Sequence, residues 1–342
     1  MSKAIERCTS CVLPATFPNI TFNSEGLCNY CQKALSPSAM ALEQERLRGR
    51  MEKVIEENKG QGKYDCIVAF SGGKDSSYVL MRLVEQYQLE CLAVTVDNGF
   101  ISEQAVKNCY AVTGALGVDF MLFRPAQDFM MRMYRVSATT GGVQTPASIK
   151  RASAICHSCI NLINNYMIQL AVQHETPMIA GGYIGGQVPK NSAVLDLDLS
   201  HLERMKAPMR PKYNALFGPA SNRFFFIRSR LLRQRQKKRI IIINPMLTLK
   251  VSEAEIIKAI STLGWVRTKD TGQNSTNCRL NNLGIAIHHK KHGFHPYVFE
   301  IAEQVRHGLM SREEGLDKIG EVPDFSDMHS QMEKVGITIN DI

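Results

Sequence analysis

The chain has no long hydrophobic run: its uninterrupted apolar stretches are no longer than a β-strand. A helix that crosses a membrane needs about 20 consecutive apolar residues, so we expect no transmembrane span. The first eleven residues, MSKAIERCTSC, also lack the apolar segment of a secretory signal peptide. These absences argue against membrane insertion and secretion, and they predict a cytoplasmic protein.

Acidic residues are absent from one segment, 204–239, which holds twelve of the 41 lysines and arginines. The formal net charge of +9 becomes −3 when these twelve charges are set aside. The basic excess therefore lies in residues 201–239, which we call the basic insertion. It is either a solvated loop or a surface for a phosphate-rich partner. Its Phe224, Phe225 and Phe226 either stack on bases or pack the insertion onto the body.

The composition is that of a globular protein. The 342 residues are 44% hydrophobic and 21% charged, which suits a sizeable core and two or more structural units. Ten cysteines would indicate disulfides in a small secreted chain. In a long chain expected inside the cell, with several cysteines in C-x-x-C pairs, they indicate metal binding instead.

Four cysteines near the N-terminus form two C-x-x-C pairs separated by sixteen residues: Cys8, Cys11, Cys28 and Cys31. Four thiolates at this spacing suit tetrahedral Zn²⁺ and leave no coordination position open. We therefore predict a structural zinc ribbon over residues 1–35, followed by a charged helical connector over 36–62.

Strand-like and helix-like segments alternate after the connector. We expect strands at 65–70, 91–97, 118–123, 177–180 and 240–244, and helices at 76–88, 102–116, 161–174 and 252–263. Ser252 and Glu255 form the capping-box pattern at the start of the last helix. Such alternation predicts an α/β fold with a parallel sheet covered on both faces. Ligands of such sheets bind at the carboxyl ends of the strands.

The stretch YDCIVAFSGGKDSSYVL runs from a strand through a glycine turn into a helix. Backbone N–H groups of Ser71, Gly72 and Gly73 can approach an anion there, and the helix dipole favours negative charge. Lys74 adds a positive charge, and Ser76 and Ser77 add two hydroxyl donors. The carboxylate of Asp75 is able to hold Mg²⁺ on a phosphate chain.

The hexapeptide SGGKDS resembles the SGGxDS pyrophosphate loop of the PP-loop ATP pyrophosphatase superfamily, which has a HUP-like fold. The resemblance implies a PP-loop domain over 63–200, with residues 240–342 completing the α/β domain and adding a mainly helical region. It also implies cleavage of ATP between its α- and β-phosphates and adenylation of a carbonyl-type oxygen. Asp97, in VTVDNGF, and Gly181 are then expected at the nucleotide, with Lys74 and Asp75 in catalytic roles.

Cys66, Cys91 and Cys109 stand in apolar or helical contexts, which predict core or surface thiols. Three further cysteines stand apart from them: Cys156, Cys159 and Cys278. Such a set suits a [4Fe-4S] cluster with one iron left open. The arrangement resembles iron–sulfur-dependent tRNA thiolation enzymes of the PP-loop class, one branch of which carries an N-terminal zinc ribbon. A second Zn²⁺, bound with the help of His157 or Cys278, is the structural alternative.

Two departures from the thiolation pattern stand out. Ile163 lies where those enzymes usually carry a lysine. The stretch GGYIGGQVPK replaces their Gly-His-x-x-Asp-Asp, so the expected carboxylate is missing. Asp196 or Asp198, in LDLDL, would compensate, but the alternation of a strand explains both equally well.

A second resemblance competes with the first. RCTSCVLP, ITFNSEGLCNYC and the phosphate-loop stretch are similar to N-acetyl sugar amidotransferases, which use the same adenylation with ammonia from a partner glutaminase. A non-catalytic nucleotide-binding module is the third hypothesis.

The stretch IHHKKHGFHPY contains four histidines: His288, His289, His292 and His295. They indicate a basic, partly solvated segment more than a metal site.

The sequence thus predicts an ATP-dependent sulfurtransferase with ATP, Mg²⁺, Zn²⁺ and a [4Fe-4S] cluster. Its expected partners are a tRNA or other nucleobase-containing acceptor, bound through the basic insertion, and a sulfur donor. No membrane partner is expected, and a homodimer stays open.

Overall fold

The computed structural model describes residues 5–141, 144–234, 239–320 and 322–342. Its centre is a six-stranded sheet in the order β3-β2-β1-β4-β6-β5. The strands are β1 Cys66–Ala69, β2 Cys91–Val96, β3 Asp119–Phe123, β4 Met178–Ala180, β5 Val194–Asp198 and β6 Arg239–Ile243. All pairings are parallel except that of β5 with β6. The expected α/β class is confirmed, with the correction that the edge strand β5 is antiparallel.

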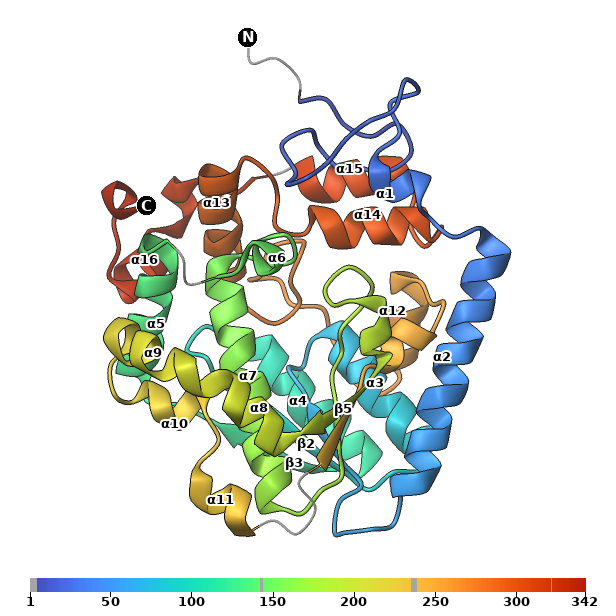
Figure 1. Cartoon of the computed structure of the whole chain (residues 1–342), viewed down its shortest axis with the longest axis vertical. Coiled ribbons are helices and arrows are strands. Elements are labelled where there is room, and N and C mark those ends of the chain that lie inside the picture. Colours follow the sequence, from blue (N-terminus) through green and yellow to red (C-terminus); the bar gives the residue numbers. More distant parts are fainter. Residues whose placement is uncertain (1–4, 142–143, 235–238, 321) are drawn as a thin grey trace.

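Helices cover both faces of the sheet (Figure 1). The first two thirds of the chain contribute α1 Asn29–Gln32, α2 Pro37–Asn58, α3 Lys74–Glu85, α4 Glu103–Leu116, α5 Gln127–Thr139, α6 Pro146–Ile149, α7 Ala154–Gln173, α8 Leu199–Lys206, α9 Arg210–Phe217, α10 Ser221–Phe225 and α11 Ser229–Gln234. The remainder adds α12 Glu253–Ser261, α13 Asn281–His292, α14 Val298–Arg306, α15 Arg312–Gly320 and α16 His329–Val335. No helix in the described ranges is both long and apolar enough to cross a membrane.

The two-residue period of the strands explains the two layers of the core. Ile67 packs with α5 and α7 on one face, whereas its neighbours Cys66 and Val68 pack with α3 and α4 on the other. Cys91 and Cys109 lie in the second layer, so these thiols, like Cys66, are core residues.

Helix α7 begins at Ala154, seven residues before the expected start. The reason is local, because the side chain of Ser153 accepts a hydrogen bond from the Cys156 N–H (3.3 Å) and caps the helix. The C-x-x-C pair therefore lies in the first turns of a helix. By contrast, the expected capping box of α12 is present, with Ser252 and Glu255 bonding each other's backbone.

The basic insertion folds into α8, α9, α10 and α11 along α5 and α7 (Figure 1). Its phenylalanines are buried, and Phe224 stacks on Phe129 with ring centroids 4.5 Å apart. Their base-stacking role is therefore wrong, and they pack the insertion onto the body. Arg235, Lys237 and Lys238 lie outside the described residues. Seven described cations of the insertion are exposed: Arg204, Lys212, Arg223, Arg228, Arg230, Arg233 and Arg239.

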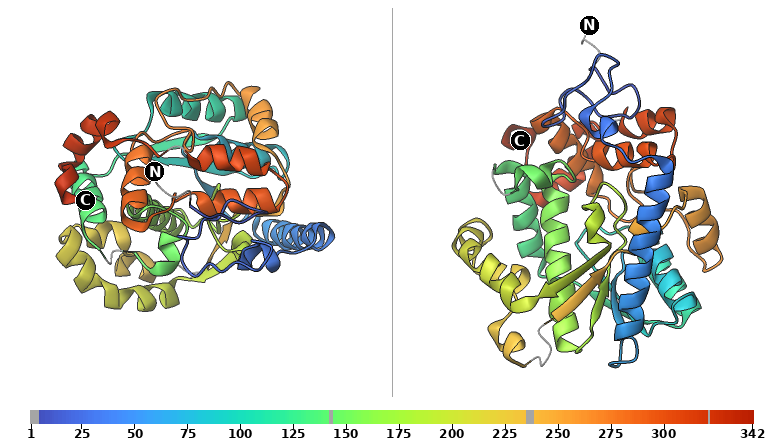
Figure 2. Two further views of the ribbon diagram at one scale, coloured as in Figure 1. Left: turned by 90° about the horizontal axis from the view of Figure 1, so that it is seen from above. Right: turned by 45° about the vertical axis from the view of Figure 1, so that its right-hand side comes forward.

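The N-terminal cysteine module lies on α14 and α15, above the sheet (Figures 1 and 2). Its Val12, Leu13 and Phe17 share one buried cluster with Phe299 and Ile301 of α14. The long helix α2 then leads from this module along the side of the molecule (Figure 2). The ribbon is thus joined to the C-terminal helices by packing, whereas the domain boundaries expected from the sequence stay predictions.

We expect Phe224→Ala to lower the free energy of unfolding by about 3–5 kcal/mol, because it removes a buried ring between the insertion and α5. Urea denaturation measures the change. Leu42→Ala on α2 is the control: Leu42 is 73% exposed, and its change should stay below about 0.5 kcal/mol. Equal effects of the two substitutions would contradict the packing role.

Candidate functional site

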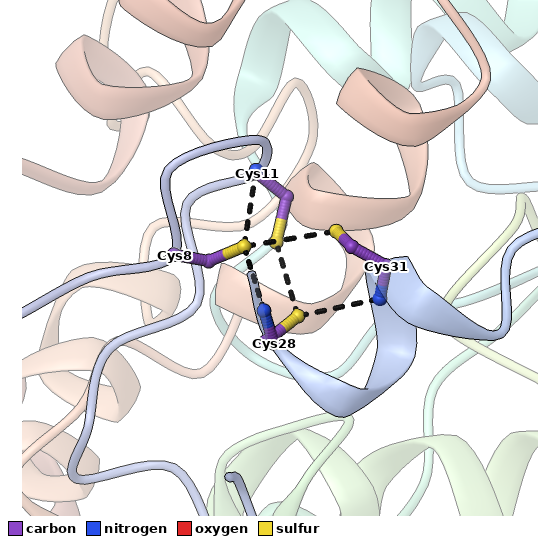
Figure 3. A group of neighbouring side chains, drawn as sticks. All are labelled: Cys8, Cys11, Cys28 and Cys31. Carbon is purple, nitrogen blue, oxygen red and sulfur yellow. Dashed lines mark hydrogen bonds between the residues drawn. The ribbon is translucent and has the colours of Figure 1, made fainter. Parts of the chain in front are cut away.

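The four N-terminal cysteines converge on one point (Figure 3). Sγ of Cys8 lies 3.7 Å from Sγ of Cys31, and Sγ of Cys11 lies 3.8 Å from Sγ of Cys28. A tetrahedral zinc ion with Zn–S bonds of about 2.3 Å requires sulfur atoms about 3.8 Å apart. The set therefore fits a zinc ribbon as expected. Backbone N–H groups of Cys11 and Cys28 point at Cys8 Sγ, as suits a thiolate ligand.

Arginines of the C-terminal helices bind this cysteine set. Arg306 donates to Cys11 Sγ (3.4 Å), and Arg312 donates to the carbonyl oxygens of Cys8 and Cys11. Arg306 also pairs with Glu303 one turn earlier on α14. A metal ion at this site would consequently fix both the ribbon and α14.

The glycine turn between β1 and α3 is held by close packing. Gly72 adopts φ +67°, and a Cβ on it would overlap the carbonyl oxygen of Ala105 in α4. Hydroxyl groups accept the turn's N–H groups: Ser71 from Gly73 (3.3 Å), and Thr276 from Lys74 (3.1 Å). The turn lies at the N-terminus of α3, where the helix dipole favours an anion, and an anion bound there would replace these hydroxyl groups as the acceptor of the N–H groups.

Lys74 and Asp75 form an ion pair in which Lys74 Nζ lies 2.9 Å from both carboxylate oxygens. Burial alone would lower the pKa of Lys74, but the carboxylates of Asp75, Glu253 and Glu300 outweigh it and raise that pKa. Lys74 is therefore a cation beside the turn at neutral pH, available to a phosphate chain.

A cavity of about 610 Å³ opens beside the turn at the carboxyl ends of the strands. Val94, Ile179 and Ile242 form part of an apolar wall, whereas Ser71, Asp75, Arg151 and Cys156 are among its polar lining. Asp75 and Glu300 also line a second cavity of about 260 Å³, into which Lys74 faces. The larger cavity has room for a nucleotide and part of a second substrate.

The three remaining candidate cysteines lie near Asn98 and Cys156, which both line the larger cavity. The amide of Asn98, at the end of β2, points its Nδ2 at Cys278 Sγ (3.4 Å) and Cys159 Sγ (3.9 Å). Tyr134 donates its hydroxyl hydrogen to Cys159 Sγ (3.4 Å). Cys156 lines the cavity itself. Folding thus brings Cys278 to the C-x-x-C pair from more than a hundred residues away.

These three thiols are not arranged for a single zinc ion. Among the described residues, the N-terminal set is the only group of three or more Cys, His, Asp or Glu whose ligand atoms lie within 4.8 Å of one another. His157 faces Asn161 at 3.2 Å instead. Burial raises the pKa of Cys156 to about 12 and of Cys159 to about 11, so a metal must displace protons to bind. Three thiols this far apart, one buried and two half-buried, fit a cluster better than a lone ion.

The other expected site residues are spread around the cavity. Ser76 and Gly181 line it, and a Cβ on Gly181 would crowd Asn244 Oδ1 at 2.7 Å. Ser77 is buried outside the lining. Asp97 accepts the Gly99 N–H and faces Arg124 at 3.4 Å, so its contact with adenosine stays a prediction.

Neither aspartate suggested as the replacement carboxylate reaches the cavity. Asp196 pairs with Arg239 at the sheet edge (3.3 Å), and Asp198 caps α8 through the His201 N–H (2.8 Å). Their spacing reflects strand β5, so the compensating role is wrong. The histidine segment also needs correction: His288 and His295 are buried, and burial lowers their pKa to about 3 and 4, so they are neutral.

Sequence reasoning missed three residues of the site. Glu300 of α14 lines both cavities, and its Oε2 accepts a hydrogen bond from Gln187 Nε2 (2.9 Å). Burial raises the pKa of Glu300 to about 7. Asn98 adjoins the predicted Asp97 and was within reach of pattern reasoning, but no local signal marks Glu300 or Gln187.

No family model matches the chain. It is similar to an uncharacterized protein of Methanocaldococcus jannaschii, 26% identical over 297 residues, which are 85% of this chain and 86% of that protein. The U34-tRNA thiolase NcsA from Methanococcus maripaludis, solved with its [4Fe-4S] cluster, gives 14% identity and a TM-score of 0.34 over 90% of this chain and 88% of that chain.

The NH3-dependent NAD synthetase from Campylobacter jejuni subsp. jejuni, solved with a nitrate ion, gives 9% identity and a TM-score of 0.35. That likeness covers 85% of this chain and 99% of the synthetase chain. At such scores neither solved structure assigns an activity to this protein.

We expect Cys11→Ser to lose one zinc ion per chain and to loosen α14, because Arg306 then faces no metal-bound thiolate. Metal analysis and hydrogen exchange measure the two effects: exchange should accelerate in residues 5–33 and in α14, but not in β1. Cys109→Ser, in the core away from the set, should keep its zinc. Full zinc content in Cys11→Ser would refute the assignment.

Proposed function

We propose that this protein is an ATP-dependent sulfurtransferase that adenylates a carbonyl oxygen of its acceptor and replaces that oxygen with sulfur. One observation carries the proposal: the glycine turn and Cys156 line a single cavity, and Asn98, which also lines it, points its amide at Cys159 and Cys278. A nucleotide-binding module without chemistry would have no use for three converging thiols there.

The phosphates of ATP would lie on the turn, with Lys74 as a counter-charge and Asp75 helping to hold Mg²⁺ on the phosphate chain. The adenosine would lie against the apolar wall that β1, β2 and β4 present. N–H groups and positive charge at the turn stabilise the charge that develops on the departing pyrophosphate.

Adenylation makes a poor leaving group into a good one. The acceptor oxygen bonds to the α-phosphorus, the bond from that phosphorus to the bridging oxygen breaks, and pyrophosphate leaves. A [4Fe-4S] cluster held by three cysteines keeps one iron free of protein ligands, which can carry a sulfide for transfer. This chain's own part is to hold the acceptor between the turn and the cysteines until AMP departs.

The acceptor we propose is a tRNA or another nucleobase-containing molecule, on the strength of the basic insertion. Several of its cations serve the fold: Arg210 pairs with Glu203, and Lys206 donates to Asn165. The exposed Arg230 and Arg233 belong to α11, at the end of the molecule away from the zinc module (Figure 1). A polyanion bound there would have to extend along the protein to reach the cavity.

Amidation of an N-acetyl sugar is the second candidate. It is favoured by the similarity of the cysteine module and the phosphate-loop stretch to the amidotransferases. The same cavity and adenylation would serve, with ammonia from a glutaminase in place of sulfide. Because ammonia needs no cluster, iron content separates the two candidates.

We expect anaerobically purified protein to contain about four iron, four sulfide and one zinc per chain. Cys278→Ala should lose the iron and keep the zinc, since the two cysteine sets are separate. Cys91→Ala, which alters a core thiol, should keep both metals. Zinc alone, even after cluster reconstitution, would refute sulfur transfer and favour amidation.

We expect pyrophosphate release from ATP with unmodified tRNA transcripts, and little with UDP-N-acetylglucosamine. Lys74→Ala should lower the rate at least about 100-fold, because the turn loses its counter-charge to the leaving group. Lys290→Ala, an exposed lysine on α13, is the control. Release only with the sugar nucleotide would point to amidation, and undiminished release by Lys74→Ala would remove the turn from catalysis.

A further inference from the structure

The larger cavity has two acidic residues among its described lining, Asp75 and Glu300. Asp75 is paired with Lys74 on the phosphate side. The residues of GGYIGGQVPK contribute no carboxylate, and Asp196 and Asp198 point elsewhere. Glu300 is therefore the acidic group left to act on the acceptor.

Glu300 lies between the two halves of the site. On the same helix face, one turn earlier, Tyr297 donates to Asn281 Oδ1 (2.6 Å), which also faces Cys156 Sγ (3.9 Å). In the other direction Glu300 shares the lining of both cavities with Asp75. Glu300, Asp75 and Cys156 line one cavity, so an acceptor that fills this cavity meets the Glu300 carboxyl group.

The loop opposite α14 is shaped to hold Glu300 in place. Gly186 adopts φ +90°, and a Cβ on it would overlap Glu300 Cα, so only glycine lets the loop approach so closely. The next residue, Gln187, donates its Nε2 hydrogen to Glu300 Oε2 (2.9 Å). The loop of residues 181–190 has no carboxylate of its own, and it positions the Glu300 carboxylate, which α14 supplies.

We propose that Glu300 is the general base that takes the N–H proton of an amide-type acceptor during its adenylation. The inference rests on the proposed adenylation and narrows its substrate: the reacting carbonyl belongs to an –NH–C(=O)– group. Both a nucleobase lactam and an N-acetyl group contain that unit.

The step balances without a further reactant. The carbonyl oxygen forms a bond to the α-phosphorus, and the bond from that phosphorus to the bridging oxygen breaks. Pyrophosphate leaves with its electron pair, the nitrogen lone pair left by deprotonation forms the C=N bond, and the proton moves to the Glu300 carboxylate. The product is an O-adenylyl imidate, whose carbon is open to sulfide or ammonia.

The surroundings of Glu300 suit this role. Burial raises the pKa of its carboxyl group and the Asp75 carboxylate does the same, whereas the hydrogen bond from Gln187 and the charges of Lys74 and Lys318 oppose them. Tyr297, the residue before α14, has a phenol that burial keeps protonated, and Glu303, one turn later on α14, is paired with Arg306 and His307. A carboxyl group that titrates near neutral pH combines two properties that a general base needs. Its carboxylate form binds a proton more strongly than an ordinary carboxylate, and a large fraction of it is ionised at neutral pH.

The test measures pyrophosphate release with two probes, unmodified tRNA transcripts and UDP-N-acetylglucosamine. The rates are measured over a range of about one to two pH units on each side of neutrality, from about pH 5.5 to about pH 9. We expect Glu300→Gln to lower the rate about 100- to 10,000-fold with whichever probe the unchanged protein uses. Its affinity for α,β-methylene-ATP should change less than about twofold, since ATP contacts the turn. Glu313→Gln, the same substitution at an exposed position on α15, should change neither.

A second variant leaves the carboxyl group in place. Gln187→Met removes the hydrogen bond that lowers the pKa of Glu300, so the acid limb of the rate profile should move to higher pH. Glu300 acts as a base only in its carboxylate form, so activity is lost as the pH falls through the pKa of Glu300. If that pKa is higher, the activity is lost at a higher pH.

Two outcomes overturn the inference in distinguishable ways. Release by Glu300→Gln at the rate and with the pH profile of the unchanged protein would overturn the role of Glu300 alone. No release by the unchanged protein with either probe, despite tight binding of the ATP analogue, would overturn the adenylation and with it this base.

Discussion

The close approach of Gly72 to α4 is the constraint on which the site depends. With no Cβ in the way, the Gly72 carbonyl oxygen accepts hydrogen bonds from Trp265 Nε1 (2.9 Å) and Asn108 Nδ2 (3.3 Å). These bonds draw in the segment that also caps the turn through Thr276 and then presents Cys278. A larger residue at position 72 would thus disturb the phosphate turn and the cysteine set together.

Helix α14 joins the N-terminal cysteine module to the larger cavity in an analogous way. Its C-terminal end meets the cysteine module through Arg306, and its N-terminal end carries Tyr297 and Glu300 into the cavity wall. The module has no open coordination position when its four thiolates bind zinc. The module therefore acts on the cavity mechanically: it holds the helix that places the Glu300 carboxyl group in the cavity wall.

Charge in this chain serves the fold as well as binding. From residue 204 onward the basic insertion has no acidic residue, yet Glu203 near its start accepts hydrogen bonds from Arg210 and from the Ile227 N–H. Buried aromatic rings then anchor the helices, and Arg210 lies over the ring of Phe226. A composition count cannot separate such structural cations from exposed ones, because the distinction is made by packing.

The sequence by itself determined the features whose cause is local. The zinc spacing, the strand-turn-helix of the phosphate loop and the capping box of Ser252 and Glu255 each depend on neighbours a few residues apart. Only the tertiary structure decided which carboxyl group lines the cavity besides that of Asp75. Glu300 and Gln187 stand 113 residues apart and meet because Gly186 lets two backbones touch, whereas Asp196 and Asp198 belong to an edge strand that faces away. A side chain's partner across such a distance is set by packing, and no periodicity of one sequence encodes it.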